Sequence, residues 1–297
     1  RALLEYALGG LRRRAGKHLA MTIGLAFVVG LYASALFLAE SLREVWRTSL
    51  VEAPDLVVQR MEGGRPALIE ESVARGLIAE GTPGVRAVVL TGTGKTFCAG
   101  GDLGWMQDNM KKSRTERVGE SGDLALMLRA LNELPMPVIG RINGPAYGGG
   151  VGMISVCDIT IAVDTGIYSL TEVRLGLLPA NIAPYVVARM GEANARRTFL
   201  TARRMSAAEA QRLGLLSEVV AADQLDAAIE RELADLLQCA PGAVAATKKL
   251  VAYVQAHDLP TNMIYTADKL ADAWETEEGC DGIASFFGKR LPMWRQV

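Results

Sequence analysis

The most apolar part of the chain is a long uncharged run near its beginning. The run from Leu19 to Ala39, LAMTIGLAFVVGLYASALFLA, would as a helix span about 30 Å, which matches the hydrocarbon core of a bilayer. Arg12, Arg13, Arg14 and Lys17 lie just before it, and this basic flank predicts that the N-terminus is cytoplasmic. We therefore expect a transmembrane helix here, with a cleavable signal peptide or a buried core helix as the alternatives.

From residue 85 onward, short β-branched runs alternate with segments of helical periodicity. Residues 85–92 (VRAVVLTG) and 138–142 (VIGRI) are expected to form strands, because short apolar runs bounded by turn residues are typical of buried strands. Between them, apolar residues recur at helical spacing from Leu124 to Leu134 and predict a helix that ends before Pro135. This part of the chain is therefore a strand, helix, strand unit.

The remaining segments continue the alternation and then become helical. Residues 158–164 and 167–170 predict two more strands, and Ser206 with Glu209 has the pattern of a capping box at the start of a helix. From Asp223 the chain is expected to be almost wholly helical. This order of elements indicates an α/β fold. We divide the chain into a membrane-helix segment (1–80), a core of strand and helix units (85–222) and a helical C-terminal region (223–297).

Composition and charge exclude several classes of function. The chain has 32 Lys and Arg against 33 Asp and Glu, so its formal net charge of -1 provides no basic excess for nucleic-acid phosphates. Its four cysteines form no C-x-x-C pair, and its two histidines are His18 and His257. We therefore expect no nucleic-acid partner, no disulfide framework and no metal site.

Three familiar catalytic or nucleotide-binding motifs fail when their full patterns are checked. GTGKT at 92–96 ends like a phosphate-binding loop, but Val89 stands where that motif needs its first glycine. The triple glycine at 148–150 does not continue as the dinucleotide-binding pattern G-x-G-x-x-G. No G-x-S-x-G sequence is present. The sequence thus supports neither a Walker A nucleotide site, nor a dinucleotide fold, nor a serine hydrolase.

Two glycine-bearing turns each come after a predicted strand. They are FCAGGD at 97–102 and GGG at 148–150, and the second leads into a predicted helix. Glycine lets the backbone approach a ligand closely, and a helix N-terminus adds a dipole that favours developing negative charge. A pair of free N–H groups from such turns can form an oxyanion hole. Either turn alone is more often structural than catalytic.

Together with SLTEVRLGLLP at 169–179, these turns resemble the crotonase (enoyl-CoA hydratase/isomerase) superfamily over about residues 85–297. The resemblance implies a ββα spiral core, here without its usual first strands, that acts on an acyl-CoA thioester with no further cofactor and forms a homotrimer or hexamer. By motif position, the oxyanion donors are the backbone N–H groups of Gly101 and Gly149. Ala99 falls where the family's backbone meets the adenine end of CoA. Phe286 and Lys289 match positions that contact CoA, in some members from a neighbouring subunit.

Hydratases of this family often use two glutamates, but this chain has Gly152 at the first position and Glu172 at the second. The resemblance therefore assigns the proton transfers to Glu172 alone. The alternative is a solvated glutamate that pairs with Arg174 or another base. The segments GPAYGGGVGM and LTEVRLGLLPANIAPYVV look most like the branch that hydrates methylglutaconyl-CoA or isohexenylglutaconyl-CoA, in leucine or acyclic terpenoid breakdown. The expected activity is that of a hydro-lyase, and a single-carboxylate enoyl-CoA isomerase is the alternative. Trp105 is expected to be a packing aromatic rather than part of the acyl pocket.

Residues 1–80 instead resemble the start of an ABC-transporter permease with a large extracytoplasmic domain. This leaves the strand at 85–92 with an expected unpaired edge, because the family's first strands have no counterpart. A CoA substrate implies a cytoplasmic enzyme, whereas the basic flank before the apolar run would export the domain that comes after the run. We therefore keep open a non-enzymatic alternative, an inactive membrane-anchored fragment fused to a truncated crotonase domain.

Overall fold

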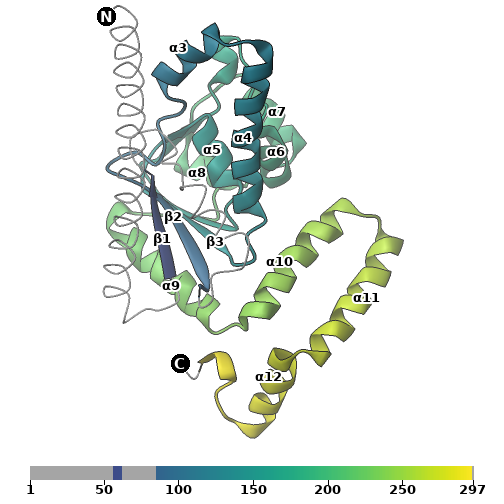
Figure 1. Cartoon of the computed structure of the whole chain (residues 1–297). Helices are drawn as coiled ribbons and strands as arrows, with labels where there is room; N and C mark the ends of the chain where they lie inside the picture. The colour runs from purple at the N-terminus through teal and green to yellow at the C-terminus, as the bar shows by residue number, and fades with distance from the viewer. Residues whose placement is uncertain (1–55, 62–84, 296–297) are drawn as a thin grey trace, which may run out of the picture. The chain divides into compact units, whose positions relative to one another are not determined.

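The computed structural model describes residues 56–61 and 85–295, which belong to one compact unit that extends from Asp55 to Val297. Its main sheet has five strands in the order β1-β2-β3-β5-β8, and every neighbouring pair is parallel (Figure 1). The strands are β1 Leu56–Met61, β2 Ala87–Gly92, β3 Val138–Ile142, β5 Ile159–Val163 and β8 Glu218–Val220. A parallel sheet with intervening helices is the α/β arrangement that the sequence predicts.

A second, smaller sheet has the order β4-β6-β7. Its strands are β4 Ala146–Tyr147, β6 Ile167–Ser169 and β7 Met205–Ser206. β4 and β6 are parallel, whereas β6 and β7 are antiparallel. The strand predicted at 167–170 therefore exists but belongs to this second sheet, a distinction that hydrophobic pattern alone does not make.

Helices come after most of the strands and make up the C-terminal part. The helices are α3 Leu103–Lys111, α4 Arg114–Asn132, α5 Gly149–Ser155, α6 Ala183–Met190, α7 Glu192–Phe199, α8 Ala207–Arg212, α9 Leu225–Leu237, α10 Pro241–Ala256, α11 Leu259–Glu275 and α12 Glu277–Gly288. Short 3₁₀ turns lie at η1 Glu172–Leu175, η2 Ala222–Gln224 and η3 Met293–Arg295. The predicted helix between 124 and 134 is the second half of α4, and the predicted helical tail is α9 to α12.

The capping box predicted at Ser206 is only half formed. The Ser206 hydroxyl accepts a hydrogen bond from the Glu209 backbone N–H, but the Glu209 carboxylate pairs with Arg203 instead of returning to the cap. A complete capping box lies at the start of α4, where Ser113 and Glu116 satisfy each other's backbone N–H groups. The ion pair with Arg203 therefore replaces the hydrogen bond from the Ser206 backbone N–H that the local pattern predicts for Glu209 at the start of α8.

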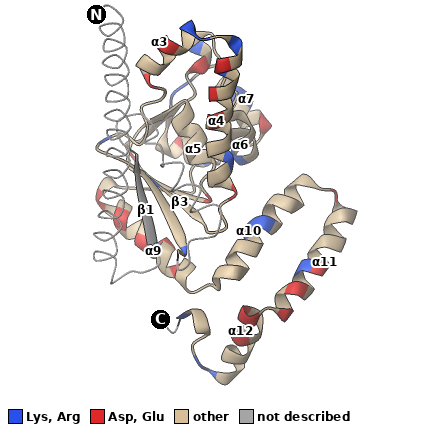
Figure 2. Cartoon of the chain, in the orientation of Figure 1, with Lys and Arg blue, Asp and Glu red and all other residues tan. Residues whose placement is uncertain are grey.

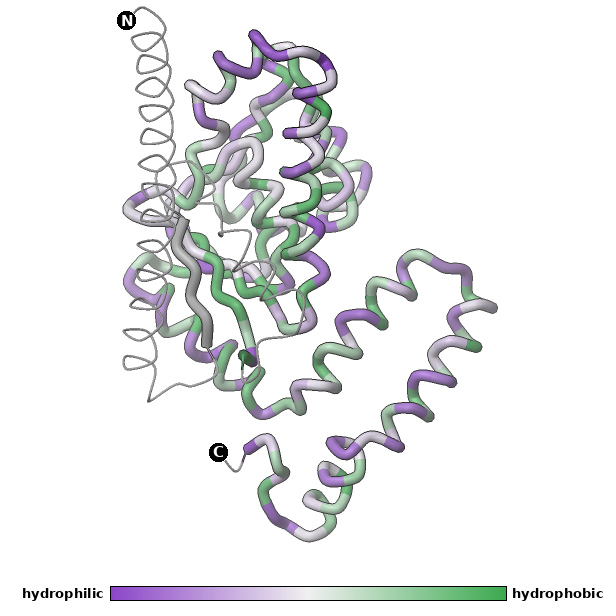
Figure 3. The backbone as a smooth tube through the Cα atoms, viewed as in Figure 1, coloured by the Kyte–Doolittle hydropathy of each residue, from purple (hydrophilic) through white to green (hydrophobic). Residues whose placement is uncertain are grey.

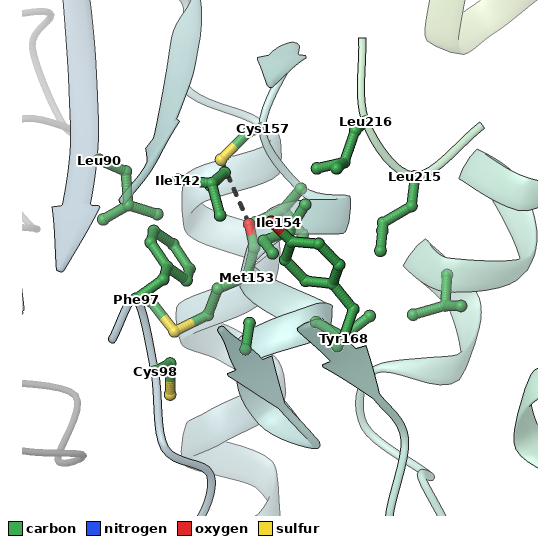
Figure 4. Packing of buried hydrophobic residues seen from close by; sticks show 14 of the residues in the cluster. Leu90, Phe97, Cys98, Ile142, Met153, Ile154, Cys157, Tyr168, Leu215 and Leu216 are labelled. Carbon is green, nitrogen blue, oxygen red and sulfur yellow. Dashed lines mark hydrogen bonds between the residues drawn. The ribbon is translucent and has the colours of Figure 1, made fainter. Parts of the chain in front are cut away.

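The core lies on both faces of the main sheet. Along β2, Val88 and Leu90 join one hydrophobic cluster, and Ala87 and Val89 join another, as the alternation of strand side chains requires. α9 covers the second cluster with Leu225, Ala228, Ile229 and Leu233. Figure 4 shows the first cluster, in which Leu90 and Phe97 lie near the sheet and Tyr168 packs close to Ile154. Because β2 is buried on both faces, it reads as a continuous apolar run.

Replacing Tyr168 by phenylalanine is expected to stabilise the protein. The Tyr168 side chain is fully buried, and its hydroxyl has no hydrogen-bond partner among the described residues. Burial also raises the pKa of the phenol above its ordinary value. Removing an unsatisfied buried hydroxyl should increase the free energy of unfolding by about 1 kcal/mol, which thermal unfolding would detect as a rise of roughly 2–4 °C in Tm.

The matched control is Ser169→Ala in the same strand. The Ser169 hydroxyl donates a hydrogen bond of 3.0 Å to the Ala202 carbonyl, and both residues are buried. Its removal should therefore lower the free energy of unfolding by about 1 kcal/mol. If both variants lost stability to a similar degree, the Tyr168 hydroxyl would have a partner after all.

The edge of β2 is paired, which corrects one expectation. Residues of β1 pair in parallel with β2 over its whole length, with Val58 opposite Val89. This strand comes from the segment assigned to the permease-like part, so the prediction of an unpaired edge at residues 85–92 is wrong. β1 has the mixed sequence LVVQRM rather than a continuous apolar run, so the hydrophobic pattern did not predict it.

The predicted transmembrane helix lies outside the described residues. The run from Leu19 to Ala39 precedes β1, and the structure does not describe it. Within residues 56–61 and 85–295, no helix combines the length and the hydrophobicity needed to cross a bilayer.

Many apolar side chains on the last three helices are exposed. Figure 3 shows hydrophobic and hydrophilic positions alternating along α10 and α11. The exposed large apolar residues of this part include Leu259, Met263, Ile264, Trp274, Phe286 and Phe287. The start of this region is tied to the core by an ion pair of 2.6 Å between Lys248 and Asp158. Several large apolar side chains of these helices are therefore in contact with water in the single chain.

Candidate active site

The two glycine-bearing turns lie side by side. Tyr147 N donates a hydrogen bond of 3.1 Å to the Cys98 carbonyl, and Phe97 N donates one of 3.0 Å to the Pro145 carbonyl. Cys98 and Ala146 also form a parallel β-bridge. A Cβ at Gly150 would lie only 2.6 Å from the Cβ of Cys98, so glycine is needed there for the two turns to approach.

The N–H groups of Gly101 and Gly149 make no hydrogen bond within the described part of the chain. Gly149 is the first residue of α5, where a helical N–H has no partner inside the helix. Gly148 and Gly100 precede them with φ values of 51° and 103°, in the region that favours glycine. The turns therefore present two unpaired backbone donors, one of them at a positive helix end.

The carboxylate of Glu172 lies against the second turn. Its Oε1 would be 3.1 Å from a Cβ at Gly148, so the carboxylate packs on the residue that caps α5. Oε2 is buried with no hydrogen-bond partner in the described structure. Burial raises the pKa of this carboxyl above its ordinary value. Glu172 begins η1, whose short turn directs the side chain back towards α5.

Glu172 is not a solvated glutamate held by a base. Among the described residues it forms no ion pair, and Arg174, the partner that the structural alternative named, is exposed. A partly buried carboxyl without a cation usually marks a site where a proton is exchanged or a ligand binds.

The position of a second acid is filled by another side chain. A Cβ at Gly152 would lie 2.1 Å from Cγ2 of Ile182, which is only 3% exposed. Gly152 is one turn of α5 after Gly148, because its N–H reaches the Gly148 carbonyl at 3.4 Å. No glutamate can replace Gly152 unless Ile182 moves. Glu172 therefore lies against Gly148, whereas Ile182 takes the place of an acid at Gly152. This steric reason was not visible in the sequence because Ile182 is distant from Gly152 in the chain.

The residues assigned to CoA lie in two different places. Ala99 is exposed in the first turn, next to Gly100. Phe286 is 79% exposed on α12, and Lys289 caps the end of that helix with a φ of 51°. α12 packs against α10, α11 and η3 (Figure 1). Within one chain, the structure therefore does not bring Phe286 and Lys289 to the two glycine turns.

The arrangement can stabilise an oxyanion and move a proton beside it. Two unpaired N–H groups can hold an enolate oxygen, and a carboxyl whose pKa is raised by burial can accept a proton and then return it. Within residues 56–61 and 85–295, no group of three or more His, Cys, Asp or Glu could hold a metal ion.

Comparisons with known proteins all match enoyl-CoA hydratases or isomerases. The family model described as enoyl-CoA hydratase/isomerase matches residues 66–297. The enoyl-CoA hydratase ACTT6 of Alternaria alternata is 37% identical over 219 residues, which are 72% of this chain and 70% of that protein. The crystal structure of an enoyl-CoA hydratase from Shewanella pealeana has a TM-score of 0.72 at 33% identity, covering 75% of this chain and 83% of that chain. Pseudomonas aeruginosa AtuE has a TM-score of 0.72 at 36% identity, covering 76% of this chain and 87% of that one.

Proposed function

This chain belongs to the enoyl-CoA hydratase/isomerase family, and we propose that it is a hydro-lyase that adds water across the C=C bond of an α,β-unsaturated acyl-CoA. One observation carries the proposal: the partly buried carboxylate of Glu172 lies against the Gly148 turn with Oε2 unpartnered. A buried carboxylate oxygen without a donor is costly, so its retention is explained best by a proton that it exchanges with a ligand.

The proposed reaction uses the two turns and the carboxylate together. Glu172 removes a proton from water, and the oxygen of that water forms a bond to C3 of the substrate. The π electrons of the C=C bond move through C2 to the thioester oxygen, and the N–H groups of Gly101 and Gly149 hold the resulting enolate. The carboxylic acid then returns a proton to C2. Atoms and charge balance with no further reactant.

The substrate class that we propose is a branched unsaturated acyl-CoA, such as methylglutaconyl-CoA or isohexenylglutaconyl-CoA. The support is the likeness of the segments around Gly149 and Glu172 to that branch. The second candidate is an enoyl-CoA isomerase, which needs only one carboxylate to shuttle a proton between two carbons. It is favoured by Ile182, which fills the place of the second acid.

We also propose that CoA is bound between copies of the chain. Ala99 would meet the adenine end, and Phe286 and Lys289 of a neighbouring copy would contact the same CoA. The exposed apolar side chains of α10 to α12 and the distance of α12 from the turns in one chain support a homotrimer or hexamer. Burial of these side chains between subunits would remove apolar surface that is otherwise in contact with water.

We propose that residues 85–222 carry out catalysis and that residues 223–297 mediate assembly of the subunits. We also propose that the protein acts in the cytoplasm, because its CoA substrate is found there. The permease-like segment 1–80, with a membrane anchor from Leu19 to Ala39, stays a proposal that rests on hydropathy and charge. Fractionation of cells that express the whole chain would test it: recovery with the membranes supports the anchor, and recovery in the cytosolic fraction contradicts it.

The activity itself is tested with the purified full-length protein. Methylglutaconyl-CoA and isohexenylglutaconyl-CoA would be offered beside unbranched crotonyl-CoA, and the loss of the conjugated thioester absorbance would be followed with mass detection of the product. We expect a product heavier by one water and a preference for a branched substrate. A product of unchanged mass with a shifted double bond would establish the isomerase instead. An inert protein would favour the membrane-anchored fragment.

A further inference from the structure

The first glycine-bearing turn, at residues 97–102, leads directly into α3. Gly101 directly precedes Asp102, the N-cap of that helix, and the Asp102 carboxylate accepts a hydrogen bond of 2.7 Å from Trp105 N. A Cβ at Gly101 would lie 3.6 Å from Sδ of Met106 on the same helix. The direction of the Gly101 N–H therefore depends on where the first turn of α3 lies.

Glu120 of α4 holds α3 near both of its ends. One oxygen of its carboxylate accepts a hydrogen bond of 3.0 Å from the indole Nε1 of Trp105, in the first turn of α3. The other oxygen pairs with Nζ of Lys112, the C-cap of the same helix. The Lys112 and Glu120 side chains are about one-third exposed or less, at 28% and 33%, so water screens this pair only in part. Figure 2 shows charges of both signs along α3 and the start of α4.

Ser121, the next residue of α4, holds the segment around Asn181, which follows Glu172 in the chain. Asn181 Nδ2 donates to the Ser121 carbonyl at 3.0 Å and to its hydroxyl oxygen at 2.9 Å. Asn181 precedes Ile182, the side chain that fills the space over Gly152. Glu120 and Ser121 are consecutive in α4. Glu120 therefore holds α3, and Ser121 holds the segment around Asn181, between η1 and α6.

We propose that Glu120 is a positioning residue for the oxyanion hole: by holding α3 at Trp105 and at Lys112, it fixes the direction of the Gly101 N–H. The inference rests on the proposed function, because it assigns a catalytic consequence to that N–H. The Trp105 side chain supports this proposal. Its indole is 45% exposed and donates its N–H to Glu120, whereas an aromatic residue that only fills the core would be buried.

The test compares Glu120→Ala, Glu120→Gln and Trp105→Phe in the full-length protein. A misplaced donor costs rate more than binding, so Glu120→Ala should lower kcat about 10- to 100-fold with a change in KM of less than about 3-fold. Glu120→Gln keeps an acceptor for the indole and should recover most of that loss. Trp105→Phe combined with Glu120→Ala should be no worse than Glu120→Ala alone, because both remove the same contact.

Asp123→Ala is the matched control, since Asp123 is exposed on the same helix and no described residue pairs with it. Two readouts keep the inference separate from the assigned reaction. Hydrogen exchange of residues 101–112 should be faster in Glu120→Ala than in wild type or Asp123→Ala. Acetoacetyl-CoA, a thioester that readily forms an enolate, should bind to wild type as the enolate and at least about 10-fold more weakly to Glu120→Ala.

Each outcome bears on one of the two proposals or on both. Faster exchange with unchanged kcat and unchanged enolate binding would overturn the positioning role and leave the proposed function intact. Unchanged exchange would overturn the anchoring itself. A wild-type protein that binds no acetoacetyl-CoA enolate would contradict the oxyanion hole, and with it the role of Glu120. A loss in both readouts with wild-type behaviour of Asp123→Ala is the expected result, even if the enzyme proves to be an isomerase.

Discussion

Glu172→Gln is expected to abolish nearly all turnover while CoA-thioester binding persists. Removal of a general acid–base group typically costs about 10²–10⁴-fold in rate, and the upper end is expected here because one carboxylate performs both proton transfers. A carboxylate at position 152 is excluded, since Ile182 occupies the space over Gly152. The measurement is kcat for hydration of the preferred substrate, with the dissociation constant of a CoA thioester determined on the same preparation.

The stability of this variant provides its control. Because burial raises the pKa of Glu172 in the folded protein, ionising it costs stability, and that cost appears as the pH rises through the folded pKa. Glutamine does not titrate, so Glu172→Gln should gain Tm relative to wild type as the pH rises above the ordinary glutamate pKa of about 4.3, and the gain should be absent below it. Lost activity with retained or raised Tm excludes unfolding as the cause. Hydration at a near-normal rate would disprove the assignment of Glu172.

Gly149→Pro is expected to lower kcat by about 10²–10³-fold, the usual cost of losing one oxyanion donor. Proline lacks the N–H that would hold the enolate oxygen. It is also well tolerated at the first position of a helix, which is where Gly149 stands in α5. The variant should therefore fold, and acetoacetyl-CoA should no longer be held as its enolate.

Gly149→Ala tests whether the backbone N–H or the glycine itself is required at this position. A Cβ at this position meets no atom within 4 Å, and alanine keeps the backbone N–H. This variant should therefore retain activity within about 10-fold of wild type, because only the surroundings of the donor change. Equal losses in the proline and alanine variants would mean that the N–H of Gly149 is not the functional group. Circular dichroism and Tm of both proteins would show whether α5 is intact.

Local sequence predicted most of the elements on which this site is built. The buried runs became β2, β3 and β5, and the periodic segment before Pro135 became part of α4. The glycines at 100–101 and 148–150 indicated two turns with free donors, because glycine is the residue that tolerates such backbone. The three residues Gly101, Gly149 and Glu172 came from the family resemblance, and the structure places Glu172 against the second turn.

The neighbours of these groups could not be predicted from local pattern. Its sequence context predicts for Glu120 only an ordinary exposed glutamate of a helix, and only the fold of the chain between α3 and α4 brings its carboxylate to Trp105 and Lys112. The unpartnered state of Glu172 was equally hidden, because a pairing with Arg174 two residues away fits the sequence as well. Long-range contacts of this kind depend on the fold and not on the spacing of residues along the chain.

Residue order alone therefore specified the α/β alternation, the helical C-terminal part and the permissive backbone at the two turns, since these depend on side-chain periodicity and glycine's freedom within a few residues. Three-dimensional packing specified that β1 covers the edge of β2, that Ile182 excludes a second acid at Gly152 and that Glu172 is partly buried without a cation. These features join segments that are far apart in the chain, and steric exclusion and desolvation arise only when such segments meet.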